Sequence, residues 1–351
     1  MASRLSADGH APRGHGRRAL GLAAAGAGAL AAPFLARAAH RTLVDDTGRE
    51  VRLPASIERV FAAGPPASVA VFALAPRTLI GWPRALRGAE RDFVPGFARD
   101  LPETGRLTGR GDTTNLETLV AMRPDLVVDV GSVSRTTIDL AERVQQRTGI
   151  PYLLLGGRFT ETPSMLLRLG EALGAQAGAA TLSAHAREVM ARFAQPAPRR
   201  LRVYYGRGPA GLETGGPGSI NVEILEFAGL ENVAKGPPSL FAVSPEQILG
   251  WDPDHVVLLD AALAARLGGD PAWRLLAAVR AGRIHVAPRL PFGWVDFPPG
   301  INRLAGLLWI ERAILGRGDD ASFSAALRRH FALVHHVDID DAAIARLLAP
   351  S

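Results

Sequence analysis

The chain has 351 residues, a length that fits two domains, and 47% of them are hydrophobic, enough for two cores. Its formal net charge is +6, but the basic residues (39 arginines and Lys235) are scattered rather than clustered between aromatic residues, so we expect no nucleic-acid binding. Cysteine is absent, so we expect no disulfide, no thiolate metal site and no lipid anchor on an N-terminal cysteine.

Residues 1–38 are predicted to be an export signal rather than part of the fold. Arg17 and Arg18 precede an apolar, alanine-rich run over 19–32, and Ala36-Arg37-Ala38 offers a small-residue cleavage site. The paired arginines favour the twin-arginine route, and the apolar run is shorter than the ~20 residues that a membrane span needs. Since no later segment of that length is free of charges, we expect a soluble exported protein without a membrane span.

One sequence pattern occurs twice. Residues 115–128 (NLETLVAMRPDLVV) and 244–257 (SPEQILGWDPDHVV) each read as a polar cap, a glutamate, a short helix, a Pro-Asp turn and a buried strand. Further strand-like segments precede and follow both copies. This alternation of strands and helices predicts an α/β fold of two lobes with parallel sheets, and a ligand cleft between the lobes.

The lobes can be placed along the chain. The N-terminal lobe is predicted over 42–174 and opens with a β-hairpin around Asp46-Thr47-Gly48. A helical run over 175–195 is the candidate connection, a single helix joining the lobes. The C-terminal lobe follows over 199–316. The remaining residues, 317–351, contain short helical patterns and form a tail to which the sequence assigns no role.

Candidate ligand-binding residues lie in turns and loops that follow predicted strands, since ligands of open α/β sheets bind outside the carboxyl ends of the strands. Two loops are rich in glycine or aromatic residues, 204–216 (YYGRGPAGLETGG) and 290–309 (LPFGWVDFPPGINRLAGLLW). The alternative is that their aromatic side chains pack in the core, and alternation along the strand places one of Tyr204 and Tyr205 there. The predicted ligand-binding residues are Pro65, Trp82, Arg110, Tyr205, Arg207, Glu213, Trp294, Asp296 and Arg303.

No catalytic constellation is visible in the sequence. There is no G-x-S-x-G motif, no thiol and no carboxylate pair with a clear role, so the chain is not expected to be an enzyme. His330, His335 and His336 cluster in the tail, but their spacing differs from the i, i+4 histidine pair of zinc enzymes, and we predict no metal site there. A secreted α/β enzyme remains the alternative to a binding protein.

Each copy of the repeated pattern carries a glutamate in the first turn of its predicted helix. Asn115 and Ser244 are the expected N-caps, and Glu117 and Glu246 follow them. A carboxylate at this place is stabilised by the helix dipole, which is a sufficient structural explanation for both residues.

Three stretches together resemble the periplasmic substrate-binding proteins of ABC importers for ferric siderophores, haem and cobalamin. They are the N-x-E…R-P-D-L-V-V pattern from Asn115, the S-x-E-Q-I-L…P-D pattern from Ser244, and P-P-x-x-N-R-L-x-G-L-x-W from Pro298. The resemblance covers about 42–315 and implies two Rossmann-like lobes bridged by one long helix. It also implies that Glu117 and Glu246 dock on arginines of the importer's permease subunits.

The resemblance further implies a soluble periplasmic receptor, expected to be a monomer, whose ligand is an iron chelate of the ferric siderophore class. No cofactor is expected apart from that ligand. The alternatives are haem, cobalamin, a nickel or cobalt chelate, or an oxyanion. Arg110, Arg207 and Arg303 are the residues expected to neutralise an anionic chelate. Many members of the family are lipoproteins, and this chain differs from them because it has no cysteine to carry a lipid.

Overall fold

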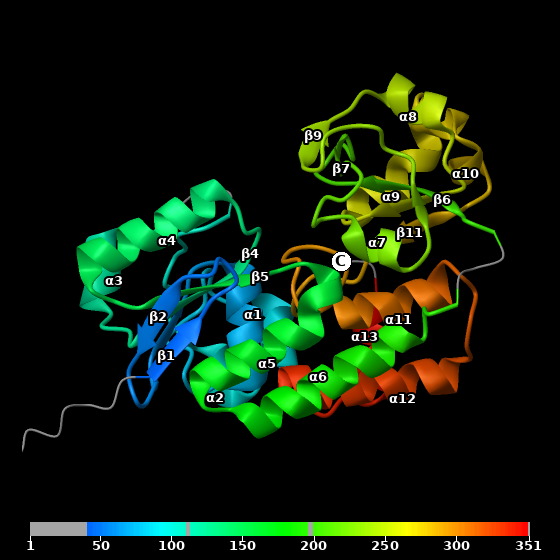
Figure 1. Cartoon of the computed structure of the whole chain (residues 1–351). Coiled ribbons are helices and arrows are strands. Elements are labelled where there is room, and N and C mark those ends of the chain that lie inside the picture. Colours follow the sequence, from blue (N-terminus) through cyan, green and yellow to red (C-terminus); the bar gives the residue numbers. More distant parts are fainter. Residues whose placement is uncertain (1–40, 110–112, 196–198, 350–351) are drawn as a thin grey trace, which may run out of the picture. The chain divides into compact units, whose positions relative to one another are not determined.

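A computed structural model of the chain describes residues 41–109, 113–195 and 199–349 (Figure 1). The predicted export signal, residues 1–38, lies outside the described residues, as does Arg110. The described chain contains two parallel β-sheets, and two antiparallel pairs of strands accompany them.

The first sheet is formed by three parallel strands in the order β3-β4-β5, whose bounds are Val60–Ala62, Leu126–Gly131 and Tyr152–Gly156. β5 is buried over its whole length, as expected for a parallel strand that helices cover on both faces. The predicted hairpin is confirmed as β1 (Arg41–Val44) paired with β2 (Glu50–Leu53).

The second sheet has four parallel strands in the order β11-β10-β6-β8. Their bounds are Ile284–Val286, His255–Leu258, Arg202–Gly206 and Glu231–Asn232. β7 (Glu213–Gly215) and β9 (Leu240–Ala242) pair beside this sheet in antiparallel fashion. The α/β class with two parallel sheets, predicted from the alternation of elements, is therefore confirmed.

The helices follow the chain order predicted by the sequence. The N-terminal half contains α1 (Pro65–Leu74), η1 (Gly88–Phe93), α2 (Gly96–Arg99), α3 (Leu116–Ala121), α4 (Arg135–Thr148), η2 (Phe159–Glu161), α5 (Thr162–Leu173) and α6 (Gln176–Ala191). The second sheet is accompanied by α7 (Glu223–Phe227), α8 (Pro245–Trp251), α9 (Ala261–Arg266), η3 (Leu267–Gly269), η4 (Trp273–Leu275) and α10 (Ala277–Arg280). The chain continues with α11 (Arg303–Ala313), α12 (Asp320–His330), the π-helical turn η5 (Phe331–His335) and α13 (Asp341–Leu348).

The repeated sequence pattern gives the same local structure in both sheets. Asp125 follows α3, and its Oδ2 accepts a hydrogen bond from the backbone N of Arg59 at 2.9 Å, at the start of the neighbouring β3. Asp254 follows α8, and its Oδ2 accepts from the backbone N of Arg202 at 3.0 Å, at the start of the neighbouring β6. Each aspartate therefore ties its own strand to the strand beside it, which explains why Pro-Asp occurs in both copies.

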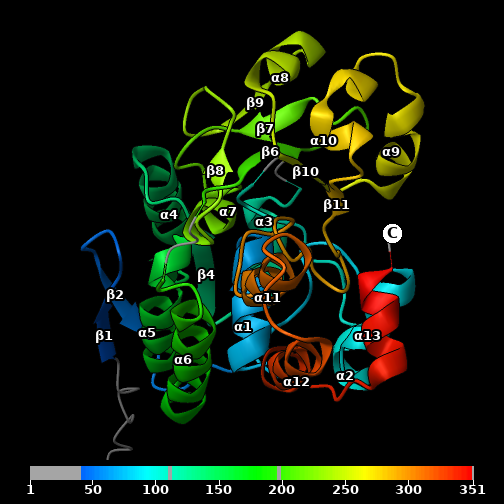
Figure 2. The ribbon, with the colours of Figure 1, turned by 90° about the vertical axis from the view of Figure 1, so that its right-hand side faces the viewer.

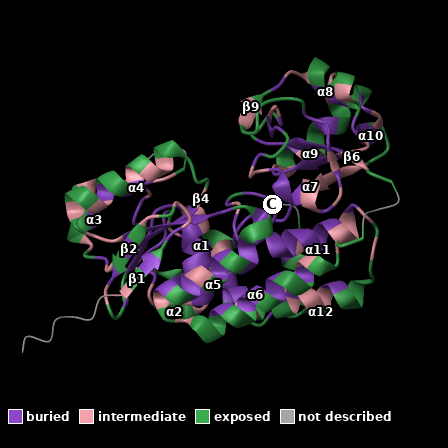
Figure 3. Ribbon diagram, viewed as in Figure 1, coloured by how far each residue is buried: buried purple, intermediate pink, exposed green. Residues whose placement is uncertain are grey.

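Four helices lie side by side at the base of the molecule as Figures 1 and 2 show it: α5, α6, α11 and α12. α5 and α6 approach closely because Gly170 has no side chain; a Cβ there would lie 2.2 Å from the Cβ of Ala179. α6 is the helix predicted to connect the lobes, and it precedes β6 in the chain. In Figure 3, α1 is almost entirely buried, which its run of apolar residues explains, whereas α4 is largely exposed.

The C-terminal residues return to the first half of the fold. α12 packs on α11, η5 packs on α1, and Arg346 of α13 pairs with Asp92 of η1. Residues 320–348 thus contribute to the core around α1, a role that the sequence did not suggest. Of the described helices, none combines the length with the apolar character that spanning a bilayer requires.

Candidate ligand-binding cavity

A cavity of about 900 Å³ is lined by residues that follow β4 and β5 of the first sheet and by residues around β7, α7 and β9 of the second half. From the first sheet and its helices come 131–133, Gly156, Arg158, Glu161 and Arg168. From the second half come 218–221, Glu223 and 238–240, and the turn of the N-terminal hairpin adds Asp45 and Asp46. With respect to the first sheet, the site lies where ligands of α/β sheets are expected, outside the carboxyl ends of β4 and β5.

The turn of the hairpin is fixed against the first sheet and forms part of the cavity wall. Asp46 Oδ2 accepts a hydrogen bond from the backbone N of Gly156 at 2.6 Å, at the end of β5, and Oδ1 pairs with Arg168 of α5. Asp45 Oδ2 pairs with Nη2 of Arg49 at 2.5 Å. Because the Asp46 side chain is only 9% exposed, this wall places a nearly buried carboxylate beside a half-exposed guanidinium.

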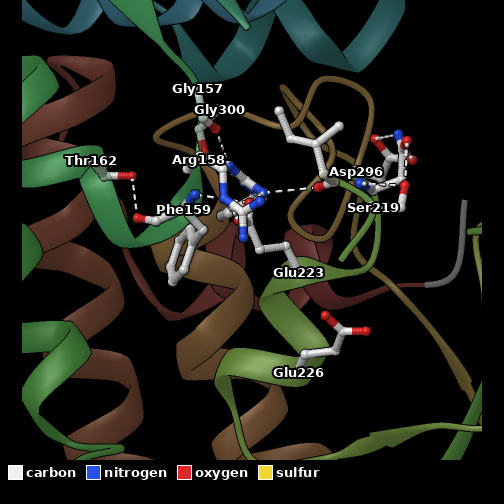
Figure 4. Close-up of polar contacts among 12 residues, drawn as sticks. Gly157, Arg158, Phe159, Thr162, Ser219, Glu223, Glu226, Asp296 and Gly300 are labelled. Atoms are coloured by element: carbon white, nitrogen blue, oxygen red, sulfur yellow. Dashed lines mark hydrogen bonds and ion pairs between the residues drawn. The ribbon is translucent and has the colours of Figure 1, made fainter. Parts of the chain in front are cut away.

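Glu223 of α7 joins the two halves of the cavity (Figure 4). Its Oε1 lies 2.7 Å from Nε of Arg158, and its Oε2 accepts a hydrogen bond from the backbone N of Phe159 at 2.8 Å. Nη1 of Arg303, from α11, lies 3.4 Å from the same Oε2. Glu226, one turn later, points away from this cluster. Glu223 therefore interacts with two guanidinium groups, one of which faces the cavity.

Arg303 is buried beneath the cavity, with 1% of its surface exposed. It donates hydrogen bonds to the carbonyl oxygens of Ile220 at 3.0 Å, Gly157 at 3.1 Å and Gly300 at 3.3 Å, and it lies over the ring of Phe159. Burial lowers the pKa of Arg303 to about 10, while Glu223 acts in the opposite direction, so the guanidinium remains charged at neutral pH.

A second buried polar cluster centres on Asp296, which is 1% exposed. Its carboxylate accepts hydrogen bonds from the hydroxyl of Tyr205 at 3.0 Å and from Nδ2 of Asn221 at 3.0 Å, and it pairs with Nε of Arg207 at 3.1 Å. Burial and the nearby Asp296 raise the pKa of Tyr205 well above its usual value. Asn221 lines the cavity, so this cluster supports the wall from behind.

The residues predicted from sequence to bind ligand lie around the cavity rather than on its wall. Of those that the structure describes, Tyr205, Arg207, Asp296 and Arg303 belong to the two clusters above, and Glu213 pairs with Arg207 at 2.7 Å. Both Tyr204 and Tyr205 are fully buried, where one core tyrosine was expected. Direct contact between these residues and a ligand stays a prediction.

The remaining three predicted residues have other surroundings. Trp82 and Trp294 are each 1% exposed, and their indole NH groups donate to the carbonyl oxygens of Ala98 and Leu290. Pro65 begins α1. In the described part of the chain, none of the predicted ligand residues is among those that line the cavity of about 900 Å³.

The cavity residues that the sequence analysis missed are Asp46, Arg158, Arg168 and Glu223. A signal existed for Arg158, because Gly156-Gly157-Arg158 directly follows a predicted strand and the carboxyl-end rule applies to it. Asp46 was recognised only as part of a turn. No local signal identifies Arg168 or Glu223, since both lie on helices and reach the cavity through the tertiary fold.

Glu117 and Glu246 lie on exposed helix starts, and both predicted caps are confirmed. The side chain of Asn115 accepts from the backbone N of Thr118 at 2.8 Å, and that of Ser244 accepts from Gln247 at 3.3 Å. A hydrogen bond from Ser244 lowers the pKa of Glu246. Each glutamate is followed three residues later by an exposed apolar side chain, Val120 in α3 and Leu249 in α8.

Two of the tail histidines, His330 and His335, are buried with His185 of α6, whereas His336 is exposed. Nε2 of His185 lies 3.2 Å from Nδ1 of His330, and His335 stacks on Phe331 with ring centroids 4.4 Å apart. His336 lies within hydrogen-bonding distance of the carbonyl oxygen of Phe72, at 3.0 Å. Within the described residues, His, Asp and Glu side chains do not gather into any group of three or more that could hold a metal ion.

Comparison with known proteins places these features in a family context. The family described as "Periplasmic binding protein" matches residues 87–289. A curated relative, a "Cobalamin-binding protein" of Halobacterium salinarum, is 28% identical over 266 residues. That match covers 68% of this chain and 66% of the relative, so the chain spans slightly less than two thirds of the length of this relative.

Two solved structures show the same fold. The ABC transporter solute binding protein from Sulfurospirillum deleyianum DSM 6946 is 24% identical, with a TM-score of 0.78 over 88% of this chain and 98% of that one. A protein of an ABC-type Fe3+-hydroxamate transport system from Saccharomonospora viridis DSM 43017 is 23% identical, with a TM-score of 0.59 over 78% of this chain and 98% of that one.

Proposed function

Because this chain belongs to the periplasmic binding protein family, we propose that it is the solute receptor of an ABC importer and that it binds a bulky metal chelate in the cavity. It delivers the chelate to the permease subunits of the importer and performs no chemistry on it. The observation that carries this proposal is the cavity of about 900 Å³, lined by polar residues of both halves of a fold typical of solute-binding proteins.

The size and chemistry of the cavity favour a chelate over a bare ion. Its volume is near the upper end of the ~300–1,000 Å³ range of small-molecule pockets. A bare cation would need a converging set of ligating side chains, and the described residues contain no such group of three. The metal is therefore expected to arrive inside an organic ligand, with the protein contacting the ligand's periphery.

Two chelate classes are candidates. An iron chelate of the ferric siderophore class is favoured by the resemblance of the sequence motifs and by the fold shared with a protein of an Fe3+-hydroxamate transport system. Cobalamin is the second candidate, because the curated relative at 28% identity is named as a cobalamin-binding protein. Both ligands are large, both hold their metal internally, and both present hydrogen-bonding groups at the periphery.

Calorimetric titration of the chain lacking residues 1–38 is the test of this proposal. The panel contains ferric hydroxamate, ferric catecholate and ferric citrate complexes, cobalamin, haem, and nickel and cobalt chelates, each beside its metal-free form. We expect saturable binding of one chelate class and none of its metal-free ligand. Calorimetry is preferable to tryptophan fluorescence because Trp82 and Trp294 are buried away from the cavity wall. Absence of binding across the whole panel would contradict the proposed function.

Docking on the permease is expected to depend on Glu117 and Glu246. Both carboxylates are exposed, and Val120 and Leu249 lie one turn away, so each helix offers an acid next to an apolar side chain. We expect the double variant Glu117→Gln/Glu246→Gln to reduce chelate uptake by roughly 10-fold or more, because each substitution removes an interfacial charge pair with a permease arginine.

The matched control for docking is Glu142→Gln, at another exposed glutamate, on α4. Uptake is measured in cells that express the receptor together with its importer, and ligand affinity is measured on the purified variants. Affinity should be the same in all of them. Unchanged uptake in the double variant would show that these two helix starts are not the docking surface.

A further inference from the structure

We propose that Arg158 is the residue that receives an anionic or strongly hydrogen-bond-accepting group of the ligand, whereas Arg168, the other arginine of the cavity wall, serves only to hold Asp46. This inference rests on the proposed function and assigns different roles to two residues of the same chemical type. It follows from the partners that each guanidinium would leave behind if it turned toward a ligand.

Arg158 can leave its partner at a lower cost than Arg168 can. Its side chain is 58% exposed, and its contact is Glu223, whose carboxylate is only 6% exposed. Glu223 also has the fully buried Arg303 within 3.4 Å and the backbone N of Phe159 at 2.8 Å. If Arg158 turned into the cavity, the charge of Glu223 would still be compensated by Arg303. Arg158 is thus the surplus cation of this cluster (Figure 4).

Arg168 is in the opposite situation. Its partner Asp46 is 9% exposed, and the other hydrogen bond to that carboxylate comes from the backbone N of Gly156 at 2.6 Å. Within the described residues, no second guanidinium is found at Asp46. Movement of Arg168 to a ligand would leave a nearly buried carboxylate without a countercharge, which is strongly unfavourable. Arg168 is therefore expected to stay with Asp46 when ligand binds.

The charges on the rest of the cavity wall determine where an anionic group of the ligand can bind. Among the residues that the structure describes, the other ionisable side chains of the wall are carboxylates: Asp45, which pairs with Arg49, and the exposed Glu161. They repel an anionic group, so such a group can be accepted well only beside Arg158. The ligand class that fits is a chelate with one localised phosphate or carboxylate, rather than one with negative charge on every side.

The first arm of the test needs no ligand. Arg158→Gln and Arg168→Gln make the same chemical change at two places in one cavity, and the urea midpoint of each is compared with the wild-type midpoint. Arg158→Gln should lower the midpoint clearly less than Arg168→Gln, since Glu223 keeps Arg303 as a countercharge. Arg168→Gln should lower it by roughly 0.5 M or more. Arg135→Gln, at an 86% exposed arginine of α4, is the control for loss of a surface ion pair.

The second arm uses pairs of probes that differ in an anionic group. Cyanocobalamin carries a phosphodiester that dicyanocobinamide lacks, and ferric citrate is anionic whereas ferrioxamine B is cationic. For the pair that the wild-type protein binds, Arg158→Gln should lower the affinity for the anionic member by about 10- to 100-fold. The affinity for the other member should stay within about twofold of the wild-type value. Arg168→Gln should change the affinity for both members by a similar factor. Arg158→Lys should retain part of the wild-type preference for the anionic member.

The outcomes separate this inference from the proposed function. Equal loss of stability in the two variants would overturn the inference, and so would an equal loss of affinity for both members of a pair in Arg158→Gln. In either case wild-type binding of a chelate would leave the proposed function standing. If the wild-type protein binds none of the four probes and no other chelate, the proposed function fails, and this inference fails with it.

Discussion

Replacing Arg303 by methionine is expected to lower the free energy of unfolding by about 3–5 kcal/mol, the range found when one partner of a buried ion pair is removed. The substitution takes away the buried countercharge of Glu223 and the donors to the carbonyl oxygens of Gly157, Ile220 and Gly300. Urea unfolding of the purified variant, followed by circular dichroism, measures the change.

The reason for so large an effect is that these contacts join distant parts of the chain. Arg303 begins α11, Gly157 follows β5, and Ile220 precedes α7. The buried guanidinium of Arg303, which is 1% exposed, therefore links the three segments that form the floor of the cavity. Methionine fills a similar volume but satisfies none of the buried acceptors, and an unsatisfied buried polar group costs ~1–3 kcal/mol.

Two further variants separate charge from hydrogen bonding. Arg303→Lys keeps the charge near Glu223, but its ammonium group cannot reach all the carbonyl oxygens. Its free energy of unfolding should therefore lie between those of wild type and Arg303→Met. Glu223→Gln leaves Arg303 buried without its acid and should also destabilise. The double variant Glu223→Gln/Arg303→Met should lose less free energy of unfolding than the sum of the losses in the two single variants, because the two side chains interact. Additive effects would mean that the two residues are not coupled.

The fold could be predicted because its signals are local and repeated. The turns at Pro124-Asp125 and Pro253-Asp254 combine a residue that ends a helix with one that bonds the neighbouring strand, and the structure shows the same hydrogen bond in both copies. The helix starts at Asn115 and Ser244 were readable for the same reason. Such patterns depend on a few adjacent residues, so sequence alone identifies them.

The cavity was harder to predict because its wall is assembled from distant residues. Arg303 is paired with Glu223, 80 positions earlier in the chain, and this pairing turns a residue expected to face the ligand into a buried one. Trp294 and Asp296 were expected in the pocket because their loop is rich in aromatic residues. Aromatic side chains also fill hydrophobic cores, and both residues are only 1% exposed. Composition therefore found the right region, and the tertiary fold decided which side chains face the cavity.

The tail gives the second large expected effect, a loss of stability in mild acid. Two of its histidines are buried against His185 of α6: His330 is fully buried, His335 is 1% exposed and His185 is 2% exposed. Burial, with a smaller contribution from Arg329, lowers the pKa of His185 to about 4 against an opposing effect of Glu188. Burial and the nearby His336 lower the pKa of His335 to about 3.

His330 behaves in the same way, since burial, with His335 and His185 as neighbours, lowers its pKa well below its usual value. In the unfolded chain each of these histidines titrates near pH 6.5. Between about pH 4 and 6.5 the unfolded state therefore binds more protons than the folded state. Stability is greatest above pH 6.5 and is lost as the pH falls, by about 2 kcal/mol per histidine at pH 5.

We therefore expect the free energy of unfolding to fall by roughly 4–6 kcal/mol between pH 7 and pH 5, measured by urea unfolding at each pH. His335→Phe tests the cause, because His335 lies stacked between Phe292 and Phe331, and its Nδ1 has no hydrogen-bond partner among the described residues. The variant should lose about one third of the pH dependence, whatever its stability at pH 7, since any packing cost of the larger ring is independent of pH. A variant with the full wild-type pH dependence would show that His335 does not contribute to the acid sensitivity.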